Sequence, residues 1–238
     1  GETHYSKINR LCKILSSKKA KYLLITAPEN IAWILNIRGF DNPNSPIPNC
    51  RMLLTNRKKI YFFAEQGKVK KIIKSGKLIA NQVFHVNKLN EILHKLDHGN
   101  IIIDNLSCSI FYENIIKSKF NIISEMDPTY QLKSIKNKTE IQGMIKSHIL
   151  DGVALTKFIY WMKNENKKKI TEIRAEKKLE EFRSLNKEYI YPSFNTIAGS
   201  GPNGAIVHYR ATKKSDRSIN KQDLFLCDSG GQYKYGTT

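Results

Sequence analysis

Along the first half of the chain, stretches with apolar residues at helical spacing alternate with short runs of consecutive apolar residues. Ile8, Leu11, Cys12 and Leu15 recur at helical spacing and predict an amphipathic helix over residues 5–18. Later elements are predicted as strand 22–26, a helix from residue 28, a hairpin of 52–55 and 60–64, helix 65–75, strand 83–86, helix 88–96, strand 101–104, helix 109–118 and strand 120–123. Strands that alternate with helices predict a layered α/β domain over residues 1–127.

The pattern changes at Pro128, which marks a boundary because proline restricts the residue before it. Thr139 begins a Thr-x-x-Gln sequence that fits a capping box and predicts a long helix to about residue 163. A polar, basic link follows at residues 164–169, and Thr171 is the expected N-cap of a second helix. The remainder is expected to form strands and glycine-rich turns, so the second predicted domain is residues 128–238.

Composition excludes several classes of protein. The chain has 238 residues, of which 40% are hydrophobic, so it can bury a substantial core and is not a disordered protein. Its longest apolar runs, residues 22–25 and 101–103, are too short to cross a bilayer. The first residues contain no apolar stretch of the signal-peptide type. We therefore expect a cytoplasmic protein without a membrane partner.

The formal net charge of +19 raises nucleic acid as a possible partner, and a nucleic-acid binder is one rival reading. However, only 8 of the 40 basic residues are arginine, the residue that base readout favours. Lysine, isoleucine and asparagine share A/T-rich codons, so base composition can produce this charge without any partner. We expect no nucleic-acid partner. The four cysteines are widely spaced and are expected to be reduced thiols.

Asp228 directly follows the apolar run 224–227 (LFLC) in the segment that begins at Asp223. In a strand, both faces of this segment are apolar, so we expect it to be buried on both sides. A carboxylate at the end of such a run is costly unless a cation or hydrogen-bond donors meet it. Asp228 is thus a candidate metal ligand or general base. The alternative is an aspartate that ends the strand and folds onto the Ser-Gly-Gly turn.

A glycine-rich loop over residues 199–204 is expected to lead into a short strand in which Ile206, His208 and Arg210 share a face. The segment lacks the phosphate-loop pattern. His208 is either a proton donor or substrate clamp, or a half-exposed strand histidine. His148 and Asp151 lie three residues apart on the long helix and can pair, which is more typical of a structural contact.

Six sequence stretches, taken in their order along the chain, resemble those of a known protein family. They are residues 28–39 (PENIAWILNIRG), 132–140 (LKSIKNKTE), 151–155 (DGVAL), 171–173 (TEI), 194–209 (FNTIAGSGPNGAIVHY) and 228–238 (DSGGQYKYGTT). In this order the chain resembles the Xaa-Pro aminopeptidases (aminopeptidase P), metallopeptidases with the pita-bread fold. The resemblance implies a creatinase N-terminal-like α/β domain, residues 1–127, followed by a truncated pita-bread α+β catalytic domain, residues 128–238.

The resemblance also implies roles for two residues. Asp228 would bind one of two divalent metal ions, usually manganese, and His208 would lie at the substrate and assist developing charge or proton transfer. Two metal ions that share a hydroxide lower its pKa and hold a peptide carbonyl for attack. Carboxylates are preferred ligands of hard divalent ions such as manganese. The implied activity releases the N-terminal residue from peptides with proline in second position. The implied parent is a cytoplasmic homodimer.

The same resemblance places the second metal aspartate at position 239, with a histidine and two glutamates farther on. It also places the start of the chain after a missing first domain. We therefore expect an internal fragment that holds one ligand of five and is inactive alone. The alternatives are a non-catalytic pita-bread protein that binds peptides or acts as a histone chaperone, a decayed gene product, and a creatinase-like or dipeptidase relative.

Overall fold

The computed structural model describes residues 1–165 and 170–238 and divides the chain into two compact units. The first unit comprises Gly1–Asn42 and Pro46–Lys136, and the second comprises Pro43–Ser45 and Asn137–Thr238. The helix α6 (Pro128–Ser134) belongs to the first unit, so the units divide nine residues after the boundary expected at residue 127. The domain limits 1–127 and 128–238 stay a prediction.

The first unit contains a six-stranded sheet in the order β4-β3-β2-β1-β5-β6. The strands are β1 (Tyr22–Ile25), β2 (Arg51–Thr55), β3 (Ile60–Phe63), β4 (Val83–Phe84), β5 (Asn100–Ile103) and β6 (Asn121–Ser124). The pairs β1·β2 and β2·β3 are antiparallel, whereas β3·β4, β1·β5 and β5·β6 are parallel. This mixed sheet confirms the predicted strands and the predicted hairpin of β2 and β3.

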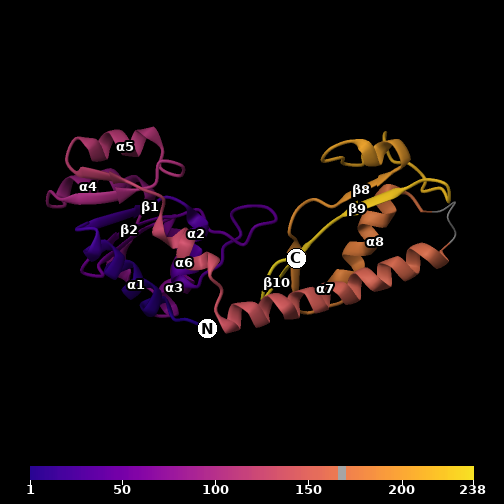
Figure 1. Cartoon of the computed structure of the whole chain (residues 1–238), viewed down its shortest axis with the longest axis horizontal. Coiled ribbons are helices and arrows are strands. Elements are labelled where there is room, and N and C mark those ends of the chain that lie inside the picture. Colours follow the sequence, from indigo (N-terminus) through magenta and orange to yellow (C-terminus); the bar gives the residue numbers. More distant parts are fainter. Residues whose placement is uncertain (166–169) are drawn as a thin grey trace. The chain divides into compact units, whose positions relative to one another are not determined.

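Helices cover both faces of this sheet (Figure 1). They are α1 (His4–Ser17), α2 (Pro28–Leu35), α3 (Lys70–Lys74), α4 (Leu89–Lys95), α5 (Ile110–Lys117) and α6, with short 3₁₀ turns η1 (Gln66–Lys68), η2 (Ala80–Gln82) and η3 (Val86–Lys88). Successive residues of a strand point to opposite faces. Leu23 and Ile25 therefore pack with α1, α2 and α3, and Tyr22 and Leu24 pack with α4 and α5. Each such buried side chain contributes about 1.5–3 kcal/mol.

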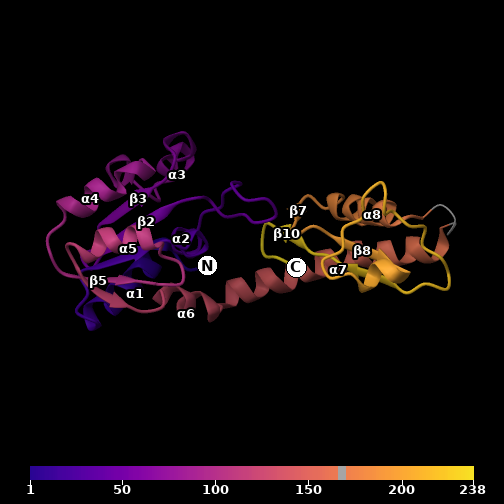
Figure 2. The same cartoon turned by 90° about the horizontal axis from the view of Figure 1, so that it is seen from above.

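The second unit is built on two helices, α7 (Lys138–Asn164) and α8 (Glu172–Ser184), as Figure 2 shows from above. Its strands are β7 (Tyr189–Pro192), β8 (Ile197–Ser200), β9 (Phe225–Asp228) and β10 (Gly231–Tyr233), and the 3₁₀ turn η5 (Gly201–Ala205) follows β8. The pairs β7·β10 and β8·β9 are both antiparallel. Phe158 of α7 and Leu179 of α8 centre the apolar core between the helices.

The N-terminus of α7 corrects one prediction. Asn137, not Thr139, is the N-cap, and it forms a capping box with Glu140 through hydrogen bonds of 2.8 and 3.0 Å. Asparagine is a strong N-cap, and the extended backbone of Asn137 lets its side chain reach the first turn. Thr171 is the N-cap of α8, as predicted. Of the predicted link 164–169, residues 166–169 lie outside the described residues.

None of the helices in the described parts of the chain has the length and apolar character that crossing a membrane requires. All four cysteines are free, and burial raises the pKa of Cys50 to about 12.

Candidate active site

Asp228 is the last residue of β9 and lies opposite Ile197 of β8. Its side chain is exposed and forms no hydrogen bond or ion pair with any residue that the structure describes, so it does not fold onto the following turn. The expected burial of β9 on both faces is wrong. Leu224 and Leu226 are 90% and 44% exposed, because the core of this unit covers only the face that carries Phe225 and Cys227.

The free carboxylate of Asp228 is chemically suited to a hard divalent cation, for which oxygen is the preferred ligand. Within residues 1–165 and 170–238, no group of three or more His, Cys, Asp or Glu side chains could hold a metal ion. Asp228 is therefore a single candidate ligand, and one carboxylate does not make a dinuclear centre.

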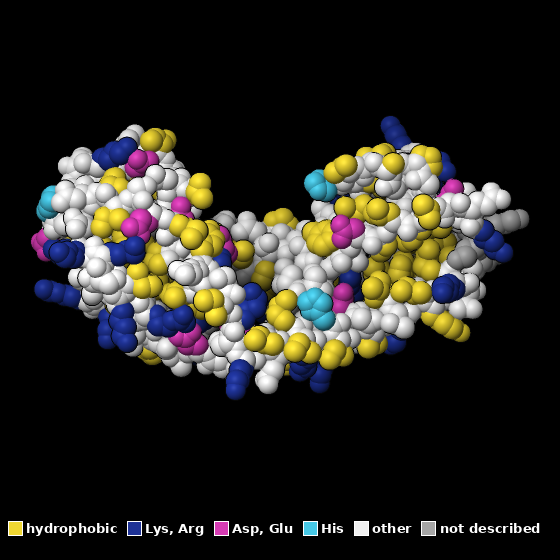
Figure 3. Space-filling view, viewed as in Figure 1, with side chains coloured by type: hydrophobic (Ala, Val, Ile, Leu, Met, Phe, Trp, Pro, Cys, Tyr) yellow, Lys and Arg dark blue, Asp and Glu magenta, His cyan; other side chains and the backbone are white. Residues whose placement is uncertain are grey.

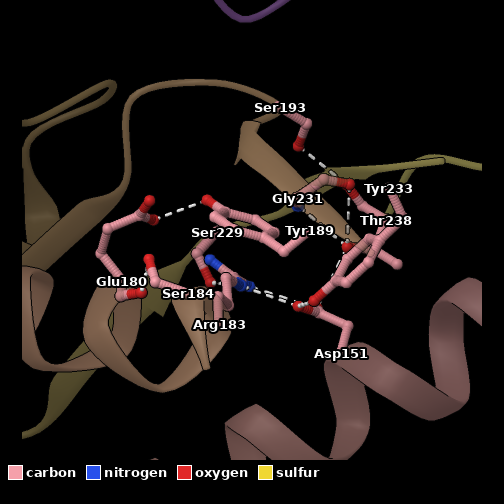
Figure 4. A network of polar contacts seen from close by, with 10 residues as sticks. All are labelled: Asp151, Glu180, Arg183, Ser184, Tyr189, Ser193, Ser229, Gly231, Tyr233 and Thr238. Atoms are coloured by element: carbon pink, nitrogen blue, oxygen red, sulfur yellow. Dashed lines mark hydrogen bonds and ion pairs between the residues drawn. The ribbon is translucent and has the colours of Figure 1, made fainter. Parts of the chain in front are cut away.

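The turn that follows Asp228 is tied to both helices by a buried polar network (Figure 4). Arg183 of α8 makes a bidentate ion pair with Asp151 of α7, at 2.7 and 3.2 Å, and donates a third hydrogen bond to Ser229 at 3.0 Å. Tyr233 and Thr238 donate hydrogen bonds to the same carboxylate at 2.8 and 3.1 Å. Burial acts to raise the pKa of Asp151, but the bonds from Arg183 and Tyr233 outweigh it and hold the pKa below its ordinary value.

This network corrects the expected pairing of His148 with Asp151. The Nδ1 atom of His148 lies 2.9 Å from the carbonyl oxygen of Met144, one turn back on α7. The Asp151 carboxylate points instead toward α8, where Arg183 is only 1% exposed. A buried arginine is costly without a counter-charge, so it takes the available carboxylate. Arg183 was not singled out from the sequence, because its partner lies 32 positions away.

The glycine-rich segment after β8 is held by one buried carboxylate. Glu172, the first residue of α8, accepts hydrogen bonds from the backbone N–H groups of Ser200 (2.7 Å) and Arg217 (3.1 Å). It also accepts bonds from the Asn203 side-chain amide (3.0 and 3.1 Å) and the Tyr209 hydroxyl (2.8 Å). Glu172 is completely buried, so these bonds replace the water it has lost. From the sequence, Glu172 was only one residue of the stretch 171–173 that carries the resemblance, and no neighbouring residue marked it as buried.

His208 does not lie in a strand, which corrects the expectation of a short strand after the glycine-rich loop. The segment forms the 3₁₀ turn η5 and then a turn in which His208 has a φ of 53°, in the left-handed region. This conformation is uncommon for residues other than glycine. Tyr209, the next residue, is buried against Glu172, whereas His208 is exposed. The burial of Tyr209 thus directs this turn and leaves the histidine in solvent.

Asp228 and His208 are carried by the same pair of strands but meet at no described contact. Asp228 lies beside the start of β8, whereas the loop leading to His208 leaves from its end, opposite Phe225. The first and last residues of β8, Ile197 and Ser200, lie about 10 Å apart along the strand. No hydrogen bond or ion pair joins the two side chains within the described residues.

The sequence matches two protein-family models. Residues 1–140 match the creatinase/prolidase N-terminal domain, and residues 142–238 match metallopeptidase family M24. The chain belongs to the creatinase/prolidase N-terminal domain family. Its second unit is part of an M24 domain.

Relatives of known sequence support this membership. The Xaa-Pro aminopeptidase ApepP of Drosophila melanogaster is 36% identical over 94% of the chain, and the probable Xaa-Pro aminopeptidase P of Laccaria bicolor is 32% identical over the whole chain. The chain spans only 37% and 38% of the lengths of these two relatives.

Solved structures share the fold. The X-prolyl aminopeptidase of Caenorhabditis elegans, described as a cytosolic enzyme with a di-nuclear active site, matches all of the chain and 40% of its own with a TM-score of 0.88 at 26% identity. The Xaa-Pro dipeptidase of Bacillus anthracis matches 99% of the chain and 63% of its own with a TM-score of 0.74, at 17% identity, which shows the fold alone. These findings confirm the predicted fold class, a creatinase N-terminal α/β domain followed by part of a pita-bread M24 domain.

Proposed function

We propose that this chain is part of a metalloaminopeptidase that releases the N-terminal residue from peptides with proline in second position. The proposal rests mainly on Asp228, whose carboxylate lies at the end of β9 in an M24 unit and forms no hydrogen bond with any described residue. The resemblance to Xaa-Pro aminopeptidases of fly and fungus supports the substrate class.

In this proposal Asp228 holds one of two divalent ions, with manganese as the metal. Two divalent ions bound there would supply a hydroxide of lowered pKa and would polarise the scissile carbonyl. His208 donates a hydrogen bond from its imidazole to the negative charge that develops on the substrate. The loop held by Glu172 presents His208, and the other ligands come from chain beyond residue 238. We further propose that the whole protein is cytoplasmic, because the nematode relative is described as cytosolic. We also propose that it is a homodimer.

The proposal is tested with two proteins, residues 1–238 alone and the same chain extended by the coding sequence that follows Thr238. Each is assayed for release of the first residue from an Xaa-Pro peptide with added Mn²⁺. We expect turnover only from the extended protein, and its loss in Asp228→Asn. Turnover by residues 1–238 alone would refute the argument that one carboxylate cannot form a dinuclear metal centre.

The extended sequence itself separates the alternatives. An aspartate at position 239, followed by a histidine and two glutamates, supports the peptidase. Loss of those residues would favour a non-catalytic pita-bread protein that binds peptides, or a decayed gene.

A further inference from the structure

The ion pair of Asp151 and Arg183 is buried at the junction of α7 and α8. Burying two charges is costly, and apolar residues of similar volume often stabilise a fold equally well. The pair is therefore weak evidence for stability alone. Its other hydrogen-bond partners, Ser229, Tyr233 and Thr238, all follow Asp228 within ten residues of the chain.

These partners hold the segment after Asp228 on both sides, as Figure 4 shows. Arg183 binds Ser229, the residue next to Asp228, and the Asp151 carboxylate binds Tyr233 of β10 and Thr238. The backbone N–H of Gly231 donates to the Thr238 hydroxyl at 2.9 Å, and the Thr238 N–H donates to the Gly231 carbonyl at 2.9 Å.

Ser193, the residue that follows β7, contacts the same turn from another side. The Ser193 hydroxyl donates to the Thr238 carbonyl at 2.8 Å, and the Ser193 N–H donates to the Gly230 carbonyl at 3.0 Å. A Cβ atom at Gly230 would overlap both Thr238 and Ser193. Only glycine therefore fits at position 230, and the turn has little freedom to move.

The consequence is a tightly held turn that carries a free carboxylate. The side chains of Ser229, Tyr233 and Thr238 each bond to Arg183 or Asp151, whereas Asp228 has no side-chain partner among the described residues. Groups that orient a metal ligand without touching the metal typically change metal affinity or activity by 10–100-fold when removed.

We propose that Asp151 and Arg183 are positioning residues for Asp228. Arg183 acts through Ser229, and Asp151 acts through Tyr233 and Thr238, so that the Asp228 carboxylate is presented to a divalent cation at a fixed place. This inference rests on the proposed function, in which Asp228 is a metal ligand. It assigns a task to two helix residues that are not themselves metal ligands in the proposed function.

Two neighbouring tyrosines offer a matched test. The rings of Tyr189 and Tyr233 pack edge to face, with centroids 5.4 Å apart, and each hydroxyl donates to a carboxylate. Tyr233 donates to Asp151, whereas Tyr189 donates to Glu180 at 2.6 Å. Tyr233→Phe and Tyr189→Phe therefore remove the same group from the same aromatic pair, and only the first touches the network. Ser229→Ala removes the link to Arg183 and leaves the ion pair intact.

Mn²⁺ alone is the probe, titrated calorimetrically into the metal-free extended protein, and amide hydrogen exchange of residues 229–238 is followed in chain 1–238. We expect Ser229→Ala and Tyr233→Phe to weaken Mn²⁺ binding at least about tenfold and to speed exchange in that segment. Tyr189→Phe should change Mn²⁺ affinity less than about twofold on the same argument. Equal effects of the two tyrosine variants, or unchanged affinity in all three variants, would overturn the positioning role.

Failure of the proposed function has a different signature, because the unsubstituted extended protein would then bind no Mn²⁺. Amide hydrogen exchange of residues 229–238 in chain 1–238 would still test whether Asp151 and Arg183 position this segment. Equal exchange rates in Tyr233→Phe, Ser229→Ala and Tyr189→Phe would overturn that role. A purely structural role would instead speed exchange throughout α7 and α8.

Discussion

The replacement Glu172→Gln tests how one buried carboxylate holds the glycine-rich loop. Oε1 of Glu172 accepts from the Ser200 N–H and the Asn203 amide, and Oε2 accepts from the Asn203 amide, the Tyr209 hydroxyl and the Arg217 N–H. Glutamine keeps the shape but turns one oxygen into an NH₂ donor. Whichever oxygen is replaced, a backbone N–H of Ser200 or Arg217 loses its acceptor.

The magnitude follows from these bonds. A buried donor without an acceptor costs about 1–3 kcal/mol, and the bonds that remain lose the strengthening that a charged acceptor gives. We therefore expect Glu172→Gln to lower the free energy of unfolding of the second unit by about 2–4 kcal/mol.

Urea unfolding followed by tryptophan fluorescence measures this change. The chain has two tryptophans, so a Trp33→Phe background leaves only Trp161, which packs against the core of the second unit. The matched control is Glu181→Gln, the same substitution on α8, where the carboxylate is 63% exposed and pairs with Lys178. The control should change the free energy of unfolding by at most about 1 kcal/mol. A Glu172→Gln value no larger than the control value would refute the reasoning.

Three further predictions follow from the same structure. Because the pKa of Asp151 is lowered in the folded chain, its stabilising contribution is complete above the ordinary pKa of 3.8 and is lost as the pH falls through the lower folded-state pKa. In Asp151→Asn, the stability followed by Trp161 fluorescence should therefore depend less on pH in that range. Because burial raises the pKa of Cys50 to about 12, a thiol reagent at pH 8 should leave it unmodified in the folded chain and label it in urea, and labelling at equal rates would contradict its burial. Phe158→Ala should lower the free energy of unfolding of the second unit by about 3–5 kcal/mol in urea titrations, and a change below about 1 kcal/mol would show that this core is loosely packed.

Much of the fold could be predicted because its signals are local. Helical spacing placed α1, and short apolar runs placed β1, β2 and β3 within a residue or two of their observed ends. Asp228 was singled out from its neighbours as a carboxylate at the end of an apolar run; one face of that run is exposed, and the role of Asp228 as a ligand stays a prediction. The N-cap of α7 was missed by two residues because Asn137 and Thr139 are both competent caps, and the backbone chooses between them.

Other features of the site depend on residues that are distant in the sequence. The partner of Asp151 could not be predicted, because Arg183 reaches it only when α8 packs on α7. The strand expected at His208 is replaced by a turn because Tyr209 buries its hydroxyl against Glu172, 37 positions away. The alternating residue types favour an extended strand locally, but they could not show that a hydrogen bond to a distant carboxylate would form a turn instead.

The sequence by itself determined the periodic elements, the family resemblance and the candidate ligand Asp228, since each is written in short runs of residues. The tertiary structure alone decided which polar groups meet and which apolar faces are covered. A buried charge must find a partner, and that partner is defined only when distant helices and strands converge. For this reason Asp228 was visible in the chain, whereas the ion pair that holds its turn in place was not.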